Sequence, residues 1–201
     1  MTRPLTAFVL TGGKSSRMGS DKAMLRLTDG ETLVEHALAL AASVASEVRL
    51  LGSREKYAAL AWAGEIVEDI YPDSGPLAGI HAGLQSTGTE LNLALAVDMP
   101  SMTFNCLEYL VHRAEESDAL VVVPEVNGLQ QPLCAIYRKA FFALAEQSLA
   151  AGRKKINAAF VPESTLVVRQ EELEAAGFSA SLFQNVNTGA EWDNFKGHPQ
   201  T

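Results

Sequence analysis

Short apolar runs along this chain alternate with longer segments in which apolar residues recur every three or four positions. Apolar runs of four to six residues bounded by glycine, proline or polar residues are typical of buried strands, and the longer periodicity is typical of helices packed on a sheet. The short runs predict strands at residues 7–10, 48–51, 65–68, 92–97, 119–123, 133–137 and 166–168. The longer segments predict helices at residues 32–40, 54–62, 77–85, 103–116, 139–151 and 171–176, with a last helix near Trp192 that Asn187 or Thr188 would cap.

Strands that alternate with helices in this way indicate an α/β fold with a mostly parallel central sheet and helices on both faces. No repeat, linker or low-complexity stretch divides residues 1–201, so we expect one domain. Ligands of such sheets bind beyond the carboxyl ends of the strands. This rule brings three features to one edge of the sheet, namely the loop that begins at Gly12, the loop at residues 69–76, and Asp98.

Composition excludes several classes of partner. A formal net charge of −8 argues against general binding to nucleic acid or to an anionic membrane, although it allows a local cationic pocket. The most apolar window, residues 91–97, is far shorter than the ~20 residues of a membrane span. The first residues lack the apolar core of a signal peptide. The two cysteines, Cys106 and Cys134, lie far apart and lack the spacing of metal ligands. We therefore expect a cytoplasmic protein with reduced cysteines.

The glycine-rich stretch from Leu10 to Lys22 follows the first predicted strand. It is not a Walker A loop, which would require a glycine where Phe8 stands, and it is not a dinucleotide fingerprint, whose third glycine is replaced by Ser16. Gly12 and Gly13 would let backbone amides approach an anion. Arg17 offers a planar fork to phosphate oxygens, and Lys22 offers a point charge. The alternative is a glycine-rich turn with solvated basic residues.

Asp98 is a candidate ligand for Mg²⁺. It ends an apolar strand, and Mg²⁺ often binds through one or two carboxylates together with substrate phosphates. The alternative is an aspartate that closes a turn before the next helix.

The four histidines form no spaced ligand set, and no nucleophile motif is present.

The stretch from Leu10 to Lys22 closely resembles the nucleotidyltransferase signature Leu-Ala-Gly-Gly-x-x-x-Arg-Met-Gly-x-x-Lys, with Thr11 in place of the usual alanine. Further segments resemble the molybdenum cofactor guanylyltransferases, the MobA-type family, and occur in the family's order. They are Asp69, Gly75-Pro76-Leu77-Ala78-Gly79, Asp98-Met99-Pro100 and Asn185-Val186-Asn187-Thr188. The resemblance covers nearly the whole chain and implies a Rossmann-like nucleotidyltransferase fold, with a nucleotide-binding half at about 1–100 and an acceptor-binding half at about 101–201.

The resemblance also implies roles for individual residues. The nucleotide would be bound by Leu10, Thr11, Gly12, Gly13 and Lys22, and its base pocket shaped by Asp69, Gly75, Pro76, Leu77 and Gly79. Arg17, Lys22 and Asp98 would be catalytic, and Asp98 would hold Mg²⁺. The pterin-bearing second substrate would lie near Arg153, Lys154, Lys155, Asn185 and Asn187. From residue types alone, the basic triplet could equally complement a helix dipole, and the asparagines could form a turn and a cap.

The reaction that the resemblance implies joins GTP to molybdenum-bearing molybdopterin, giving the guanine dinucleotide cofactor and pyrophosphate, with a molybdoenzyme or chaperone as a possible partner. A phosphate monoester acceptor is already largely dianionic at neutral pH, so no protein nucleophile or strong base is needed. Strand two ends in Leu50-Leu51-Gly52-Ser53, where the family commonly has an asparagine near the nucleotide. The alternatives are therefore a cytidylyltransferase acting on the same pterin, a sugar- or polyol-phosphate nucleotidyltransferase, and a non-catalytic nucleotide-binding protein.

Overall fold

The computed structural model describes residues 4–12, 22–27 and 30–186. Its strands are β1 (Leu5–Leu10), β2 (Glu47–Leu51), β3 (Glu65–Val67), β4 (Leu91–Ala96), β5 (Val121–Val126), β6 (Leu129–Gln130), β7 (Cys134–Arg138) and β8 (Thr165–Arg169). Its α-helices are α1 (Leu33–Val44), α2 (Arg54–Tyr57), α3 (Pro76–Ser86), α4 (Phe104–Glu115), α5 (Phe141–Ala150) and α6 (Gln170–Ala175). Short 3₁₀ helices span Lys22–Met24, Ile156–Ala159, Pro162–Ser164 and Ala180–Phe183.

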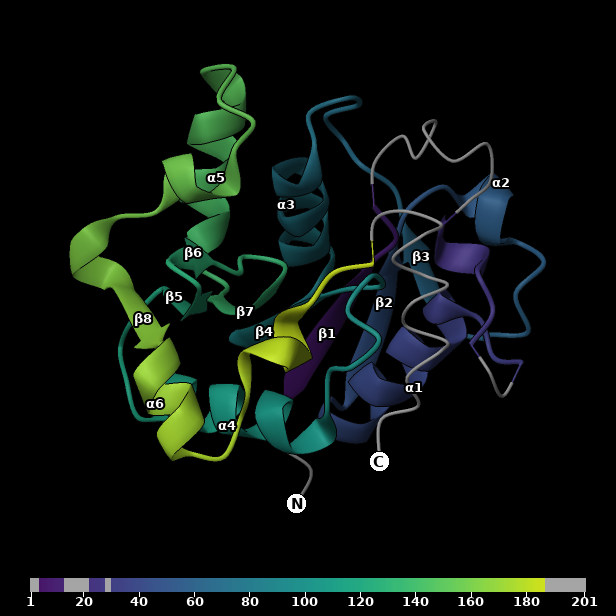
Figure 1. Cartoon of the computed structure of the whole chain (residues 1–201). Coiled ribbons are helices and arrows are strands. Elements are labelled where there is room, and N and C mark those ends of the chain that lie inside the picture. The colour runs from purple at the N-terminus through teal and green to yellow at the C-terminus, as the bar shows by residue number, and fades with distance from the viewer. Residues whose placement is uncertain (1–3, 13–21, 28–29, 187–201) are drawn as a thin grey trace.

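The strands form one sheet in the order β3-β2-β1-β4-β7-β5-β6, and β8 pairs with β5 (Figure 1). The pairings β1–β2, β1–β4, β2–β3 and β5–β8 are parallel, whereas β7 runs antiparallel between β4 and β5. The expected α/β fold with a mostly parallel sheet is confirmed. Because β5 runs antiparallel to β7, it points the same way as β4, so the carboxyl ends of β1 to β5 lie at one edge.

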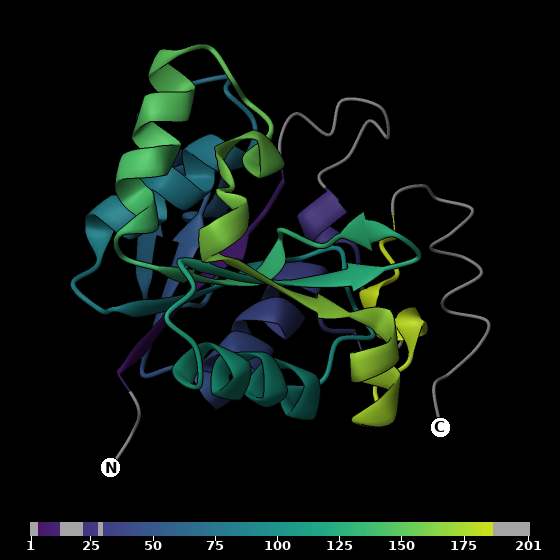
Figure 2. The same ribbon diagram turned by 90° about the vertical axis from the view of Figure 1, so that its left-hand side faces the viewer.

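Helices cover both faces of the sheet. Helices α3 and α5 lie on one face, and α1, α4 and α6 lie on the other (Figure 2). Strand β1 shows why both faces are apolar, since Leu5, Ala7 and Val9 belong to the core under α1 and α4 while Phe8 and Leu10 belong to the core under α3 and α5. This alternation follows from the two-residue period of a strand.

Helix α3 lies very close to the sheet at Gly83. A Cβ atom added at Gly83 would stand 2.9 Å from the ring of Phe8, so the helix can reach this position only with a residue that has no side chain. The small residues predicted to suit close packing at residues 77–85 therefore allow α3 to lie directly on β1.

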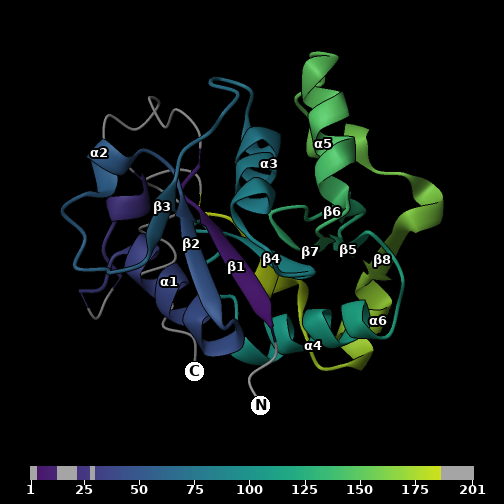
Figure 3. The same ribbon diagram turned by 180° about the vertical axis from the view of Figure 1, so that it is seen from behind.

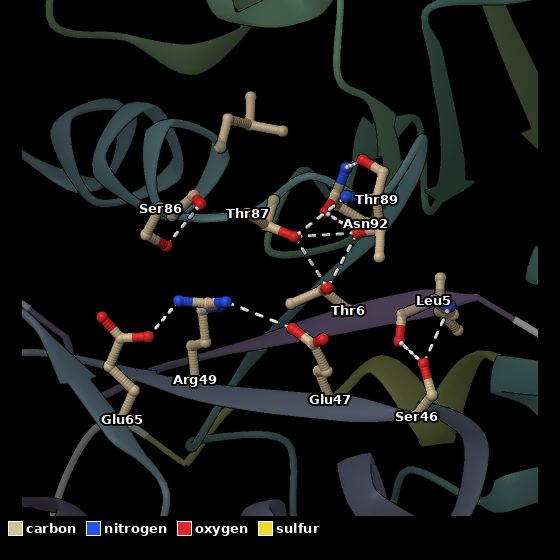
Figure 4. Close-up of polar contacts among 12 residues, drawn as sticks. Leu5, Thr6, Ser46, Glu47, Arg49, Glu65, Ser86, Thr87, Thr89 and Asn92 are labelled. Carbon is tan, nitrogen blue, oxygen red and sulfur yellow. Dashed lines mark hydrogen bonds and ion pairs between the residues drawn. The ribbon is translucent and has the colours of Figure 1, made fainter.

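A buried polar network ties β1 to β4 at the edge opposite the strand carboxyl ends (Figure 4). The hydroxyl of Thr89 donates to Thr6 Oγ1 at 2.7 Å and contacts Thr87 Oγ1 at 2.9 Å, and Thr6 Oγ1 lies 2.9 Å from Thr87 Oγ1. The side-chain amide of Asn92 donates to the Tyr137 carbonyl at 3.3 Å. These partners explain how polar residues are accommodated in a buried part of the sheet.

The structure differs from the prediction at two elements. The helix predicted at residues 54–62 is limited to Arg54–Tyr57, since Tyr57 is its only buried side chain and no apolar face favours further turns. Strand β6 was not predicted because it is only two residues long and partly exposed. The helix expected near Trp192 lies outside the described residues. No helix in the described ranges is both long and apolar enough to cross a bilayer.

Candidate functional site

The carboxyl ends of β3, β2, β1 and β4 are joined in a row by backbone hydrogen bonds beyond the strands. The amide of Val97 donates to the Leu10 carbonyl at 3.1 Å, the amide of Thr11 to Leu51 at 3.3 Å, and the amide of Gly52 to Val67 at 3.0 Å. Figure 3 shows these four strands side by side. The row brings the start of the glycine-rich loop between Asp98 and the end of β2, at the edge of the sheet where the sequence predicted that the Gly12 loop and Asp98 would meet.

Lys22 and Asp98 form an ion pair at this edge. The Nζ atom of Lys22 lies 2.9 Å from Oδ2 of Asp98, and the two side chains are only 14 % and 22 % exposed. The short 3₁₀ helix that begins at Lys22 carries the ammonium group back across the end of β1 to β4. The fold thus brings a cation and a carboxylate that are 76 positions apart in the sequence into a partly buried contact.

The second carboxylate oxygen of Asp98 is suited to a metal ion. Asp98 Oδ1 is buried and has no hydrogen-bond partner among the described residues. The amide of Val186 donates to the Asp98 backbone carbonyl at 2.9 Å, which brings the chain next to Asn185 to the end of β4. Asn185 Oδ1 is also buried, with no hydrogen-bond partner in the part of the chain that the structure describes. A buried oxygen without a partner is costly unless a donor or a cation satisfies it, and oxygen ligands are those that Mg²⁺ prefers.

No group of three or more histidine, cysteine, aspartate or glutamate side chains suited to a metal occurs within the described ranges. A closed protein cage is therefore absent from that part of the chain. The donor set of Asp98 fits an ion that takes its remaining ligands from substrate phosphates and water.

Thr11 fixes the start of the loop. Its hydroxyl donates to the Leu51 carbonyl at 3.1 Å, the same carbonyl that accepts from its own amide. A Cβ at Gly52 would stand 2.5 Å from Thr11 Oγ1. The position of the Thr11 hydroxyl therefore requires a glycine at residue 52. Ser53, the one polar side chain at the end of β2, caps α2 by accepting from the Lys56 amide at 3.4 Å.

Asp69 and the start of α3 form the next part of the edge. Pro76 is the first residue of α3, and a Cβ at Gly79 would lie 3.5 Å from Asp69 Oδ1, which places the carboxylate over the first turns of the helix. Burial by the surrounding protein raises the pKa of Asp69, although the residue itself is exposed to solvent.

The basic run after α5 lies against the same loop. Lys154 Nζ donates to the Asp73 carbonyl at 2.9 Å, and a Cβ at Gly75 would lie 3.8 Å from the Lys154 carbonyl oxygen. The guanidinium of Arg153 is 3.5 Å from Ser148 Oγ, and Arg153, Lys154 and Lys155 are all exposed. Sequence reasoning assigned the run to the acceptor half and did not anticipate its contact with the loop before α3.

Three candidate residues, Gly13, Arg17 and Asn187, lie outside the described residues. The structure brings together Leu10, Thr11, Gly12, Lys22 and Asp98 with Asn185, and separately brings the basic run to the segment that contains Asp69, Gly75, Pro76, Leu77 and Gly79. Sequence reasoning treated His81 as a structural or surface residue. The structure buries His81 in α3, two residues after Gly79 and only 2 % exposed.

The comparisons with known proteins agree over almost the whole chain. The family model described as "MobA-like NTP transferase domain" matches residues 7–186. A protein of Carboxydothermus hydrogenoformans named "Probable molybdenum cofactor guanylyltransferase" is 31% identical, over 94% of this chain and 93% of its own. A protein of Mycobacterium bovis with the same name is 33% identical, over 94% and 92%.

Solved structures agree in fold. The crystal structure of molybdopterin-guanine dinucleotide biosynthesis protein A from Archaeoglobus fulgidus superposes with a TM-score of 0.81, covering 96% of this chain and 97% of that one at 24% identity. The 4-diphosphocytidyl-2C-methyl-D-erythritol synthase of Anaerococcus prevotii superposes with a TM-score of 0.73, covering 98% and 96% at 13% identity. Since proteins named for guanine and for cytidine share this architecture, the fold by itself does not select the base.

Proposed function

Because this chain belongs to the MobA-like NTP transferase family and is a nucleotidyltransferase, we propose that it transfers GMP from GTP to the terminal phosphate of Mo-molybdopterin. The products are molybdopterin guanine dinucleotide and pyrophosphate. The observation that carries the proposal is the Lys22–Asp98 pair, with Asp98 Oδ1 buried and unpartnered beside the start of the glycine-rich loop. The choice of guanine and of the pterin acceptor is supported by the relatives named molybdenum cofactor guanylyltransferase.

In the proposed reaction, an oxygen of the acceptor phosphate attacks the α-phosphorus of GTP. The bond from that phosphorus to the β-phosphate oxygen breaks, and pyrophosphate leaves. The acceptor monoester is largely dianionic at neutral pH, so no side chain has to remove a proton. Catalysis then depends on positioning and on compensation of negative charge.

The residues around the strand ends have separate parts in this proposal. Backbone amides of Gly12 and Gly13 hold the triphosphate, with Leu10 and Thr11 fixing the start of the loop. Lys22 and Arg17 compensate the charge of the departing pyrophosphate. Asp98 would hold Mg²⁺, which when bound supplies positive charge to the phosphates.

The proposal assigns the base and the acceptor to different residues. Asp69 and the segment with Gly75, Pro76, Leu77 and Gly79 border the base. Arg153, Lys154 and Lys155 provide positive potential for the acceptor phosphate, and Asn185 and Asn187 contact the acceptor near Asp98. The hydrogen bond from the Val186 amide to the Asp98 backbone carbonyl supports this last assignment, because it brings the chain next to Asn185 to the residue that would hold Mg²⁺.

The experiment is incubation of the protein with GTP, Mg²⁺ and molybdopterin, with pyrophosphate and the dinucleotide product as readouts. We expect pyrophosphate release that depends on both GTP and molybdopterin. A parallel panel with CTP, ATP and UTP tests the base. Preference for CTP would replace guanylyl transfer by cytidylyl transfer, and nucleotide binding without turnover would indicate a non-catalytic binding protein.

A further inference from the structure

The loop between β3 and α3, residues 68–75, has little backbone structure of its own. The amide of Ser74 donates to the Tyr71 carbonyl at 3.3 Å, and Ser74 Oγ donates to the Pro72 carbonyl at 3.4 Å. Asp73 adopts a left-handed backbone conformation with φ of 58°. A loop with few internal backbone hydrogen bonds depends on contacts with neighbouring elements to hold one conformation.

An aromatic stack behind the loop provides such a contact. The ring of His81 in α3 stacks on Phe142 in α5, with centroids 4.5 Å apart and planes at 25°. Tyr71 of the loop also contacts His81, in an edge-on arrangement with centroids 5.2 Å apart and planes at 78°. The imidazole thus contacts both the loop and α5, and α3 and α5 lie side by side (Figures 1 and 3).

His81 acts in this stack as a neutral ring. It is 2 % exposed, and neither ring nitrogen has a hydrogen-bond partner among the described residues. The nearest carboxylate oxygen, Glu146 Oε1, lies 3.9 Å from Nε2, and Glu146 is itself about half exposed. A buried imidazole that makes no hydrogen bond contributes its flat apolar faces, which is the property that the stack uses.

The same loop is held from a second direction by Lys154, which donates to the Asp73 carbonyl at 2.9 Å. Both supports come from residues 142–154, whereas the loop and its helix belong to the first half of the chain. The loop carries Asp69 and ends at Gly75, immediately before α3. Displacement of Tyr71 would therefore shift Asp69 and Gly75, which border the base in the proposed function.

We propose that His81 is a positioning residue of the nucleotide site, which transmits the position of Phe142 to Tyr71 and so fixes the loop at residues 68–75 in the conformation that binds the base. This inference rests on the proposed function for the identity of the nucleotide. The contact between ring and loop stands independently of it. His81 touches neither substrate nor reacting atoms, so its effect is expected in nucleotide affinity rather than in the chemical step.

The test compares His81→Leu, which removes the flat ring at similar size, with His81→Phe, which keeps it. Hydrogen exchange of the peptide at residues 68–77, followed by mass spectrometry on the full chain, reports on the loop without any activity. We expect faster exchange in His81→Leu and near-normal exchange in His81→Phe. The KM for GTP is expected to rise roughly two- to tenfold in His81→Leu, the range of an aromatic pair, while kcat and the KM for molybdopterin stay unchanged.

Leu84→Val is the matched control, because Leu84 is fully buried in the same helix and belongs to neither the stack nor the proposed site. It is expected to lower Tm without changing exchange of the loop. Unchanged exchange in His81→Leu would overturn the inference, as would faster exchange with an unchanged KM for GTP. If the wild-type protein does not use GTP, the proposed function fails, and the exchange comparison still decides whether His81 holds the loop.

Discussion

The ammonium group of Lys22 lies 2.9 Å from the carboxylate of Asp98, and the other oxygen of that carboxylate is buried with no hydrogen-bond partner among the residues that the structure describes. The pair sits where the glycine-rich loop begins, between the ends of β1 and β4. A carboxylate that is half satisfied by a lysine and half open can accept a cation without losing its first partner. With a cation bound, Lys22 and the ion would together supply positive charge where the proposed triphosphate would lie.

Replacement of Lys22 by alanine is expected to lower kcat by about 100- to 1,000-fold, the range for loss of one electrostatic contact to a transition state. The fold should persist, because β1 and β4 are joined by their own backbone ladder. Steady-state pyrophosphate release and a thermal melt check both statements. Arg169→Ala, a change at an exposed ion pair with Glu125, serves as the charge control. Turnover near that of the wild type in Lys22→Ala would remove Lys22 from the mechanism.

The isosteric change Asp98→Asn is expected to reduce turnover by about 100-fold or more and to weaken the dependence on Mg²⁺, since a neutral amide is a poor ligand for this ion. A titration of activity with Mg²⁺, together with direct metal binding in the presence of nucleotide, provides the measurement. Asp118→Asn changes an exposed carboxylate in the loop before β5. This control should leave turnover and its dependence on Mg²⁺ unaffected. An unaltered Mg²⁺ titration in Asp98→Asn would exclude Asp98 as the metal ligand.

Stability is expected to fall as the pH drops through the range in which His81 titrates. Burial lowers the pKa of His81 below its ordinary value of 6.5, and the Glu146 carboxylate offsets this only in part. Above pH 6.5 the imidazole is neutral in both the folded and the unfolded chain. Below pH 6.5 the imidazole is protonated in the unfolded chain but still neutral in the folded chain. The free energy of unfolding therefore decreases with falling pH until the pKa of the folded state is passed.

Urea unfolding at pH 7.5 and pH 5.5 measures this effect. The difference in unfolding free energy between the two pH values should be smaller in His81→Phe than in the wild type, because phenylalanine cannot titrate. An equal difference in the two proteins would show that other groups account for the pH dependence.

Gly83→Ala is expected to destabilise the protein by about 1–3 kcal/mol, because the new methyl group would stand 2.9 Å from the Phe8 ring and force α3 away from the sheet. Gly88→Ala is the control. A Cβ there meets nothing within 4 Å, so the change should stay within about 0.5 kcal/mol of the wild type. Chemical denaturation gives both values, and equal effects of the two substitutions would contradict the close approach of α3 to β1.

The local sequence pattern was sufficient for most elements. Apolar runs identified the strands of the sheet, and Thr32 and Thr103 stand at the N-caps of α1 and α4, whose start the pattern gave within one residue. Element type depends on periodicity and on end signals within a few residues, so one sequence contains this information. The four-residue α2 was overestimated because a helical pattern does not reveal how much of the segment meets the core.

The gathering of Gly12, the loop at residues 69–76 and Asp98 at one edge was also predictable. It requires only that β1, β3 and β4 run parallel, since the loops at their carboxyl ends then meet. The resemblance to the MobA-type family, which the match to residues 7–186 confirms, added a proposed substrate to this edge. No composition or spacing argument would have supplied that substrate.

The sequence by itself determined the α/β class, the order of the strands and helices along the chain, and the motifs that mark a nucleotidyltransferase. Only the tertiary structure decided which side chains meet. The antiparallel insertion of β7 between β4 and β5, the 2.9 Å contact of Lys22 with Asp98, and the stacking of Phe142 on His81 join residues far apart in the chain. Such contacts depend on strand register and on helix packing across the whole sheet, and a local pattern of apolar and polar positions contains neither.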